Sequence, residues 1–161
     1  MSVCEYQELI GILTIVAHDG NGKLLWQQQF RNLITSGGKR LLASLLIGTS
    51  ELPTQWDMVV GSGTQPADVA DTALQQLVER APCSRTRMRV DASSLNGAAK
   101  VGLHLEATLP TGNSADPPQT LSEAGILVTV GSTQTLFNRV TFDAVNRIPA
   151  ISITLAWDIL F

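Results

Sequence analysis

Residues 151–161, ISITLAWDILF, constrain the fold more than any other stretch of the chain. Large apolar side chains stand at every second position, and most positions between them are small or polar. Side chains of a β-strand point alternately to its two faces, whereas a helix repeats about every 3.6 residues. The alternation therefore predicts a strand with one buried face. The apolar face carries Ile151, Ile153, Leu155, Trp157, Ile159 and Phe161.

The same period of two runs through much of the remaining chain and predicts two hairpins. The first would turn at 19–22, because this Asp-Gly-Asn-Gly stretch supplies the residues that tight turns need. The second would turn within 94–98. Eight strands are expected in all, at about 9–18, 24–30, 56–61, 83–90, 101–109, 122–130, 135–145 and 150–160.

Two stretches have helical spacing instead. In 35–48, TSGGKRLLASLLIG, four leucines share one face, which we expect to pack on the core. Thr35 or Ser36 would cap its start and Gly48 its end. A second short helix is expected through TALQQLVER, with Asp71 or Thr72 as its cap.

These elements predict a mainly β protein. The strands and helices do not alternate regularly, which disfavours a doubly wound parallel sheet. We therefore expect residues 1–161 to form a single-domain antiparallel β-sandwich, jelly-roll-like, with two short helices. A chain of 161 residues is long enough to bury a core without disulfides or metals.

Charge and cysteine content narrow the function classes. The net charge of −3 gives no general attraction to nucleic acid or to an anionic membrane, and neither is an expected partner. Cys4 and Cys83 form no local metal-binding pair, so two free thiols in a reducing compartment are expected. The first twenty or so residues lack the pattern of a secretory signal, and no apolar run reaches the length of a membrane span. We expect the protein to be made and kept soluble in a cytoplasm.

No motif predicts a cofactor. Gly61 and Gly63 follow a strand, but the third glycine of a dinucleotide-binding loop would fall at residue 66, which is Pro66. A turn after a strand is the favoured interpretation. His104 and Glu106 share a strand face and could hold a metal, although such pairs are more often a solvated surface.

Catalytic residues are equally sparse, and none is predicted. Cys83 lies near Arg80 and Arg85, which could lower its pKa. Glu106, Glu123 and Asp143 are the carboxylates that a glycosidase would need, but nothing in the sequence fixes any two at a suitable separation.

Five residues are candidates for binding a protein partner. Arg85, Arg87 and Arg89 fall on one face of a strand and could bind an acidic surface, although a solvent-exposed face is the commoner explanation. Ala156 and Leu160 lie on the less apolar face of the last strand, where they could contact a partner.

Three stretches, 31–48, 58–80 and 121–161, resemble small structural proteins of tailed bacteriophages, in the tail-fibre, collar and baseplate-associated group. The same modules occur in phage-derived contractile injection particles. The resemblance covers about half of the chain, and the order and spacing of the motifs carry it. The matching positions are Asn32, Thr35, Gly38 and Lys39; Gly61, Gly63 and Thr64; Asp71 to Leu74; Glu123 and Gly125; and Phe137, Arg139 and Phe142.

The resemblance implies a non-enzymatic virion subunit, such as a tail, baseplate or fibre-attachment adaptor. Its partners would be further copies of itself, as a trimer or hexamer, and other virion proteins. It also implies that the glycine turn at 61–64 leads into a short helix that closes the sandwich. Two alternatives remain open: a host-attachment module that binds a glycan through the loop 111–120 or Trp56-Asp57, and a capsid-attached decoration or fibre protein.

Overall fold

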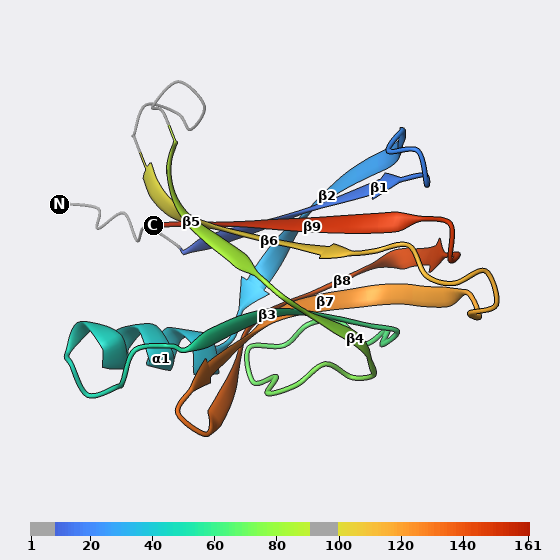
Figure 1. Cartoon of the computed structure of the whole chain (residues 1–161). Coiled ribbons are helices and arrows are strands. Elements are labelled where there is room, and N and C mark those ends of the chain that lie inside the picture. The colour runs from blue at the N-terminus through green and yellow to red at the C-terminus, as the bar shows by residue number, and fades with distance from the viewer. Residues whose placement is uncertain (1–8, 91–99) are drawn as a thin grey trace, which may run out of the picture.

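The computed structural model describes residues 9–90 and 100–161, and these form nine antiparallel strands and one helix (Figure 1). The expectation of a mainly β fold is confirmed. The elements are β1 (Ile10–His18), β2 (Leu24–Ile34), α1 (Ser36–Leu46), β3 (Gln55–Gly61), β4 (Leu77–Pro82), β5 (Ser84–Val90), β6 (Lys100–Leu109), β7 (Gln119–Val130), β8 (Thr133–Arg147) and β9 (Ser152–Leu160).

All nine strands belong to one sheet in the order β4-β3-β7-β8-β2-β1-β9-β6-β5, which curls until it is nearly closed into a barrel. The two end strands, β4 and β5, are consecutive in the chain and separated only by Cys83. The Cys83 N–H donates to the Trp56 carbonyl oxygen of β3 at 2.8 Å. One continuous run of chain therefore joins the two ends of the sheet.

A second junction lies between β2 and β8, which pair through only two residue pairs, Leu33 with Arg139 and Ile34 with Asn138. Beyond these pairs the two strands diverge. Phe30 of β2 and Phe142 of β8 stack there with ring centroids 5.2 Å apart. An aromatic contact thus joins the strands where backbone pairing ends.

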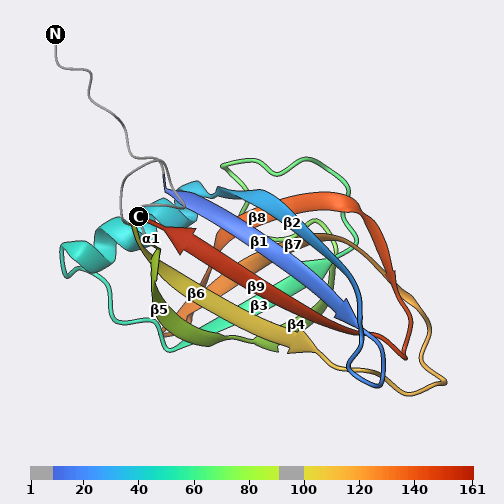
Figure 2. The same cartoon turned by 90° about the horizontal axis from the view of Figure 1, so that it is seen from above.

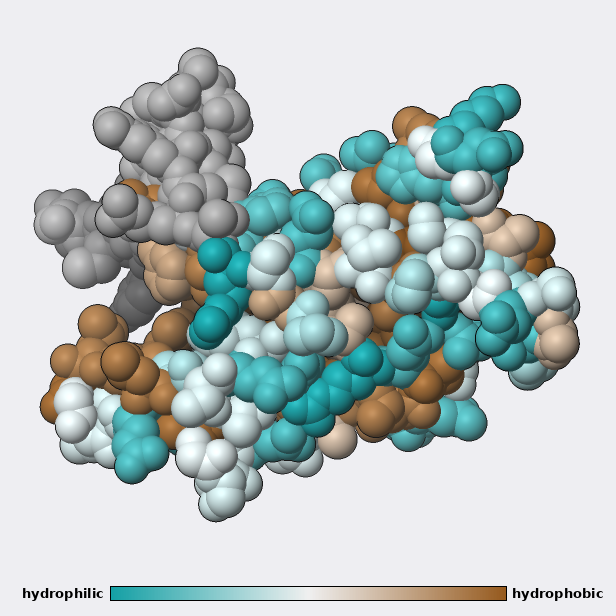
Figure 3. Space-filling view, in the orientation of Figure 1, coloured by the Kyte–Doolittle hydropathy of each residue, from teal (hydrophilic) through white to brown (hydrophobic). Residues whose placement is uncertain are grey.

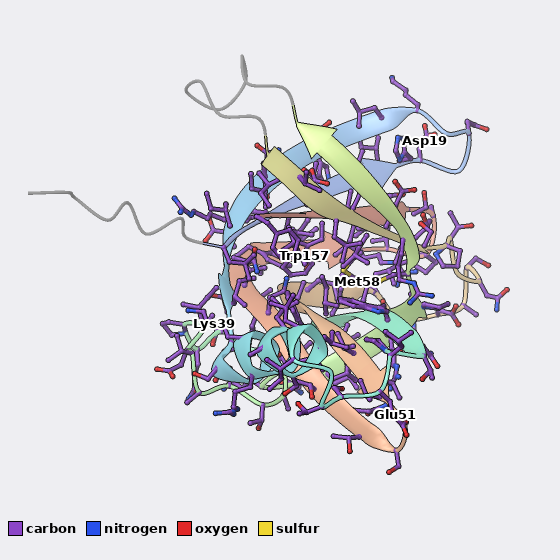
Figure 4. The ribbon with its side chains drawn as sticks, turned by 90° about the vertical axis from the view of Figure 1, so that its left-hand side faces the viewer. Asp19, Lys39, Glu51, Met58 and Trp157 are labelled. Carbon is purple, nitrogen blue, oxygen red and sulfur yellow. The ribbon has the colours of Figure 1, made fainter. Side chains whose placement is uncertain are left out.

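The core is built from the alternating residues that the sequence indicated. Leu155, Trp157 and Ile159 of β9 are buried, as are Leu13 and Ile15 of neighbouring β1. Figure 4 shows Trp157 and Met58 directed into the interior between the two halves of the curled sheet. Each such side chain contributes about 1.5–3 kcal/mol on burial, so these strands supply much of the stability.

Both predicted hairpins are present. β1 pairs with β2 across the turn at 19–22, where the Asp19 carboxylate accepts the N–H groups of Asn21 and Lys23, and Gly22 has a φ of +80°. β5 pairs with β6, while the predicted turn at 94–98 lies outside the described residues. Figure 2 shows β1, β9 and β6 side by side, with β9 between the other two.

The second predicted helix is wrong. Residues 72–76 form bends and irregular chain, and the next residues form β4, a strand that was not predicted and that pairs with β3. TALQQLVER has helical spacing, but the Gln75 and Gln76 N–H groups are bonded to the Glu123 carboxylate. A tertiary contact therefore overrides the local helix propensity.

The first helix is confirmed, with Thr35 as its N-cap, but its leucines do not all face the core. Gly38 is its only buried residue. Leu41 and Leu42 are partly buried and pack against the core, whereas Leu46 is exposed. The helix packs along β8 at its start, and its far end projects beyond the sheet (Figures 1 and 2).

Candidate protein-interaction surface

A buried carboxylate anchors the loop between β3 and β4. Glu123 of β7 has no exposed surface, and its side chain accepts three backbone N–H groups from that loop. The distances are 3.0 Å from Gly63, 3.0 Å from Gln75 and 2.7 Å from Gln76. Residues at both ends of the loop therefore bind one side chain, which fixes the loop against β7.

Arg139 of β8 balances the charge of Glu123. Its Nε donates to Glu123 Oε2 at 2.9 Å, and its Nη1 donates to Asp71 Oδ2 at 2.8 Å. Nη2 also donates to the Gln65 carbonyl oxygen at 3.1 Å. Arg139 is buried, and a buried cation needs partners of this kind to offset its desolvation.

These contacts keep both carboxylates ionised. Burial raises the pKa of Glu123, but the N–H groups of Gln76 and Gln75, the Arg139 guanidinium and the Gly63 N–H together lower it below its ordinary value. Burial also raises the pKa of Asp71, and the Asp68 N–H and Arg139 together outweigh that effect. We name Glu123, Arg139 and Asp71 the ion network.

The ion network unites motif residues that are distant in the sequence. Gly63 and Asp71 lie in the loop, Glu123 lies on β7, and Arg139 lies on β8. A Cβ on Gly63 would overlap both Glu123 and Gln75, so only glycine fits there. These four residues therefore share a structural role, and the spacing of their segments in the sequence was the signal that could have indicated it.

The start of α1 is fixed to the same region. The Thr35 hydroxyl donates to the Leu136 carbonyl oxygen at 2.5 Å and accepts the Gly38 N–H at 3.0 Å. The Ser36 N–H donates to the Val69 carbonyl oxygen of the anchored loop at 2.7 Å. The helix is thus held at its N-terminal end by both β8 and the loop.

The far end of α1 is closed by its own hydrogen bonds. The Ile47 N–H donates to the Ala43 carbonyl oxygen at 3.1 Å, and the Thr49 N–H donates to that of Ser44 at 3.0 Å. Gly48 has a φ of +72°, the left-handed conformation that commonly follows a helix. The projecting end therefore has a defined geometry.

The end of α1 and the segment that leads from it to β3 carry the most exposed apolar side chains of the described residues. Leu46 is 88% exposed, Leu52 is 80% exposed and Ile47 is 73% exposed. Figure 3 shows the corresponding brown cluster at the α1 end of the molecule. Single exposed leucines are ordinary, but a cluster on a fixed element is typical of an interaction surface.

A groove of about 590 Å³ adjoins this end. It lies between α1 and the chain at the start of β1 and the end of β9, and apolar side chains line it. We name it the α1 groove, and its lining residues are Leu9, Leu42, Leu45, Leu46 and Phe161. Water finds few hydrogen-bond partners in such a groove, which favours an apolar occupant.

The residues predicted to bind a partner lie elsewhere. Arg85 is exposed on β5, while the backbones of Arg87 and Arg89 pair with Leu103 and Val101 and their side chains lie outside the described part. The arginine stripe stays a prediction.

The β9 surface is smaller than expected. Ala156 is half-buried and Leu160 is only 3% exposed, so Leu160 offers little surface to a partner, and a partner contact at these two residues stays a prediction. The β9 backbone pairs Leu160 with Ile10 of β1 and Gly102 of β6, which places it between two strands.

The expectation that Cys83 could have a lowered pKa is also wrong. Burial and the negative charge of Asp57 raise the pKa of the Cys83 thiol to about 12, and they outweigh Arg85. Arg80 instead binds the Asp57 carboxylate.

His104 and Glu106 do lie close together on β6, with His104 Nε2 3.5 Å from Glu106 Oε2. On the other side, His104 Nδ1 lies 2.6 Å from Asp158 Oδ1 of β9. The hydrogen bond to Asp158 raises the pKa of His104, and Glu106 adds to that effect. No group of three or more His, Cys, Asp or Glu among the described residues could hold a metal ion.

The two regions considered for glycan binding differ, since Trp56 and Asp57 make internal contacts whereas the loop 111–120 is largely exposed. Trp56 lies against Phe137 with ring centroids 5.9 Å apart, and Asp57 is buried. The loop 111–120 borders a cavity of about 380 Å³ beside Arg147. The Arg147 guanidinium donates to Glu79 at 2.5 Å and Gln119 at 2.7 Å.

Comparison with protein-family models, curated proteins and solved structures found no match to the chain. Within the described residues, no helix has the length and apolar character needed to cross a membrane.

Proposed function

We propose that this chain is a non-enzymatic structural subunit of a tailed-bacteriophage virion, a tail, baseplate or fibre-attachment adaptor that acts through protein–protein contacts. The observation that carries the proposal is the apolar surface at the end of α1. Leu46 and Ile47 are exposed at the last residue and the C-cap of a helix whose two ends are both fixed, and Leu52 is exposed in the segment that follows. Burying such side chains against a protein would release the water around them and favour assembly.

The ion network supports the same proposal. It joins four of the motif residues on which the resemblance to phage structural proteins rests, and it holds the loop that supports α1. In this proposal the motif maintains the scaffold that presents the interaction surface. We further propose that the two halves of the sheet, β5-β6-β9-β1-β2 and β4-β3-β7-β8, act as the two layers of a sandwich.

The proposal is tested by the composition of virus particles. Particles purified from a lysate of the source strain would be digested and analysed by mass spectrometry. We expect peptides of this chain in the particle fraction at a fixed ratio to a known virion protein, and the ratio should persist after a second density gradient. Peptides found only in the soluble fraction would overturn the proposal.

A glycan array separates this function from host attachment through a sugar. The purified chain would be applied to the array with a bacterial glycan-binding protein as the positive control. We expect no specific signal. Binding that is lost on mutation of the 111–120 loop would instead support the glycan-binding alternative.

A further inference from the structure

We propose that the α1 groove is a two-fold contact between two copies of this chain, with the two α1 helices antiparallel. The inference rests on the proposed function, because it names the surface through which a self-assembling subunit would pair. The α1 groove offers both a hollow and a protruding side chain, Leu46, at its edge. In a two-fold contact the same surface of each copy meets the other. A surface that has both a hollow and a protrusion can therefore fit against a second copy of itself.

The exposed side of α1 has the spacing of a helix-pairing seam. Lys39, Leu42 and Leu46 are separated by three and four residues, and they therefore follow one another along one side of the helix. Leu42 is half-buried and packs partly against the core, as does Leu41 on the adjoining side, whereas Leu46 is exposed. Leu42 and Leu46 are the apolar members of this narrow seam, and apolar side chains spaced by three and four residues interlock when two helices pack together.

Electrostatics favours the antiparallel arrangement. Lys39 and Arg40 lie near the start of α1, and its last turn carries no basic residue. The C-terminal end of a helix carries a partial negative charge. In α1 no basic side chain of the same helix lies beside that charge. Antiparallel pairing places Lys39 of each copy beside the C-terminal end of the other helix, so the cation and the helix dipole attract twice in each contact.

The neighbouring residues provide matched controls. Arg40 lines a different cavity together with Ser44 and Asp71, on another side of α1. Ile47 is exposed like Leu46 but does not line the α1 groove. Figure 4, which looks along α1, shows Lys39 and Glu51 on opposite sides of the helix. Changes at positions 40, 47 and 51 should therefore leave the contact largely intact.

The first experiment measures self-association by sedimentation equilibrium. We expect the wild-type chain to reach an even multiple of its 17.2 kDa mass. Leu46→Asp should raise the dissociation constant at least about tenfold, and Ile47→Asp less than about threefold. Lys39→Glu should raise it about fivefold, whereas Arg40→Glu and Glu51→Lys should change it less than about twofold.

The second experiment tests the antiparallel geometry by disulfide trapping in a Cys4→Ser, Cys83→Ala background. Lys39→Cys and Leu46→Cys proteins would be oxidised separately and as a mixture. We expect a covalent dimer chiefly in the mixture, because position 39 of one copy faces position 46 of the other. Efficient trapping requires Cα atoms within about 7 Å.

The outcomes separate this inference from the proposed function. A wild-type monomer at 100 μM, a strict trimer, or equal effects of Leu46→Asp and Ile47→Asp would each overturn the two-fold contact. So would α1-dependent binding to phosphatidylglycerol vesicles by a chain that stays monomeric. The virion proteomics decides the proposed function independently, since a subunit that pairs through another surface would still be found in the particle.

Discussion

At the scale of single residues, Gly38 shows how closely α1 approaches the sheet. A Cβ at this position would overlap the Phe137 carbonyl oxygen of β8, and backbone cannot move aside as a flexible side chain can. Alanine is favoured over glycine within helices by about 1 kcal/mol, but overpacking costs about 1–3 kcal/mol. The steric cost should exceed the gain in helix propensity.

We therefore expect Gly38→Ala to lower the free energy of unfolding by up to about 2 kcal/mol in urea titrations. Gly37→Ala is the matched control, because the nearest atom to its Cβ would be the Thr135 methyl group at 3.1 Å, and backbone would lie no nearer than 3.6 Å. Equal stability of the two variants would show that α1 is not seated on β8 as described.

Cys83 supports a second prediction at this scale. With a pKa of about 12, roughly one thiol in ten thousand is ionised at pH 8, compared with about a quarter in an unfolded chain. Iodoacetamide should therefore modify Cys83 of the folded Cys4→Ser variant at least about a hundredfold more slowly than in 8 M urea. Comparable rates in the two conditions would contradict the described environment of the thiol.

At the scale of elements, the ion network is the attachment of the β3–β4 loop. Glu123→Gln keeps the size of the side chain but leaves the buried Arg139 with Asp71 as the one carboxylate partner that the ion network gives it. Removing one partner of a buried ion pair costs about 3–5 kcal/mol. We expect a loss of this size in urea unfolding, whereas Glu51→Gln at an exposed position should change stability by less than about 0.5 kcal/mol.

Hydrogen exchange provides the element-specific readout for Glu123→Gln. The amides of Gln75 and Gln76 should lose protection in this variant before those of β1, because the mutation releases the loop first. Uniform loss of protection across the sheet would mean that Glu123 stabilises the whole molecule rather than the loop.

At the scale of the whole molecule, stability should decrease both at low pH and at high pH. The lowered pKa values of Glu123 and Asp71 stabilise the fold above their ordinary values of about 4, and this contribution is lost as the pH falls through the lower folded values. The raised pKa of His104 makes a contribution to stability with the opposite pH dependence. Its contribution is complete below about pH 6.5 and is lost as the pH rises through the higher folded value.

We therefore expect the carboxylates and His104 to contribute together, so that the free energy of unfolding is highest between about pH 4 and pH 6.5. Urea unfolding at a series of pH values from 3 to 9 measures the profile. His104→Gln should remove the decline on the alkaline side and leave the acid side unchanged. A wild-type profile that rises steadily above pH 6.5 would contradict the described contact between His104 and Asp158.

The sequence predicted the parts of the fold that have strong periodicity. The alternation in β9 and the turn at 19–22 identified a strand and a hairpin because burial and turn geometry act locally. The helix assigned to 72–80 failed for the opposite reason. Glu123, which holds Gln75 and Gln76, lies more than forty residues away, and no local pattern reports such a contact.

The candidate site was predicted only in part. The helical spacing located α1, and Thr35 was correctly identified as its cap. The sequence could not show that α1 continues past the sheet, because a leucine that meets the core and a leucine that meets solvent look alike in a helical pattern. Leu42 and Leu46 illustrate this, since the first packs partly against the core and the second is exposed.

The place of β9 in the sheet has a consequence for protein synthesis. This strand lies between β1 and β6, so it pairs with two segments that are synthesised well before it. While the chain is still emerging from the ribosome, the facing edges of β1 and β6 have no strand between them. The sheet can therefore become continuous only once residues 152–160 have left the exit tunnel, and folding is completed after synthesis of this segment.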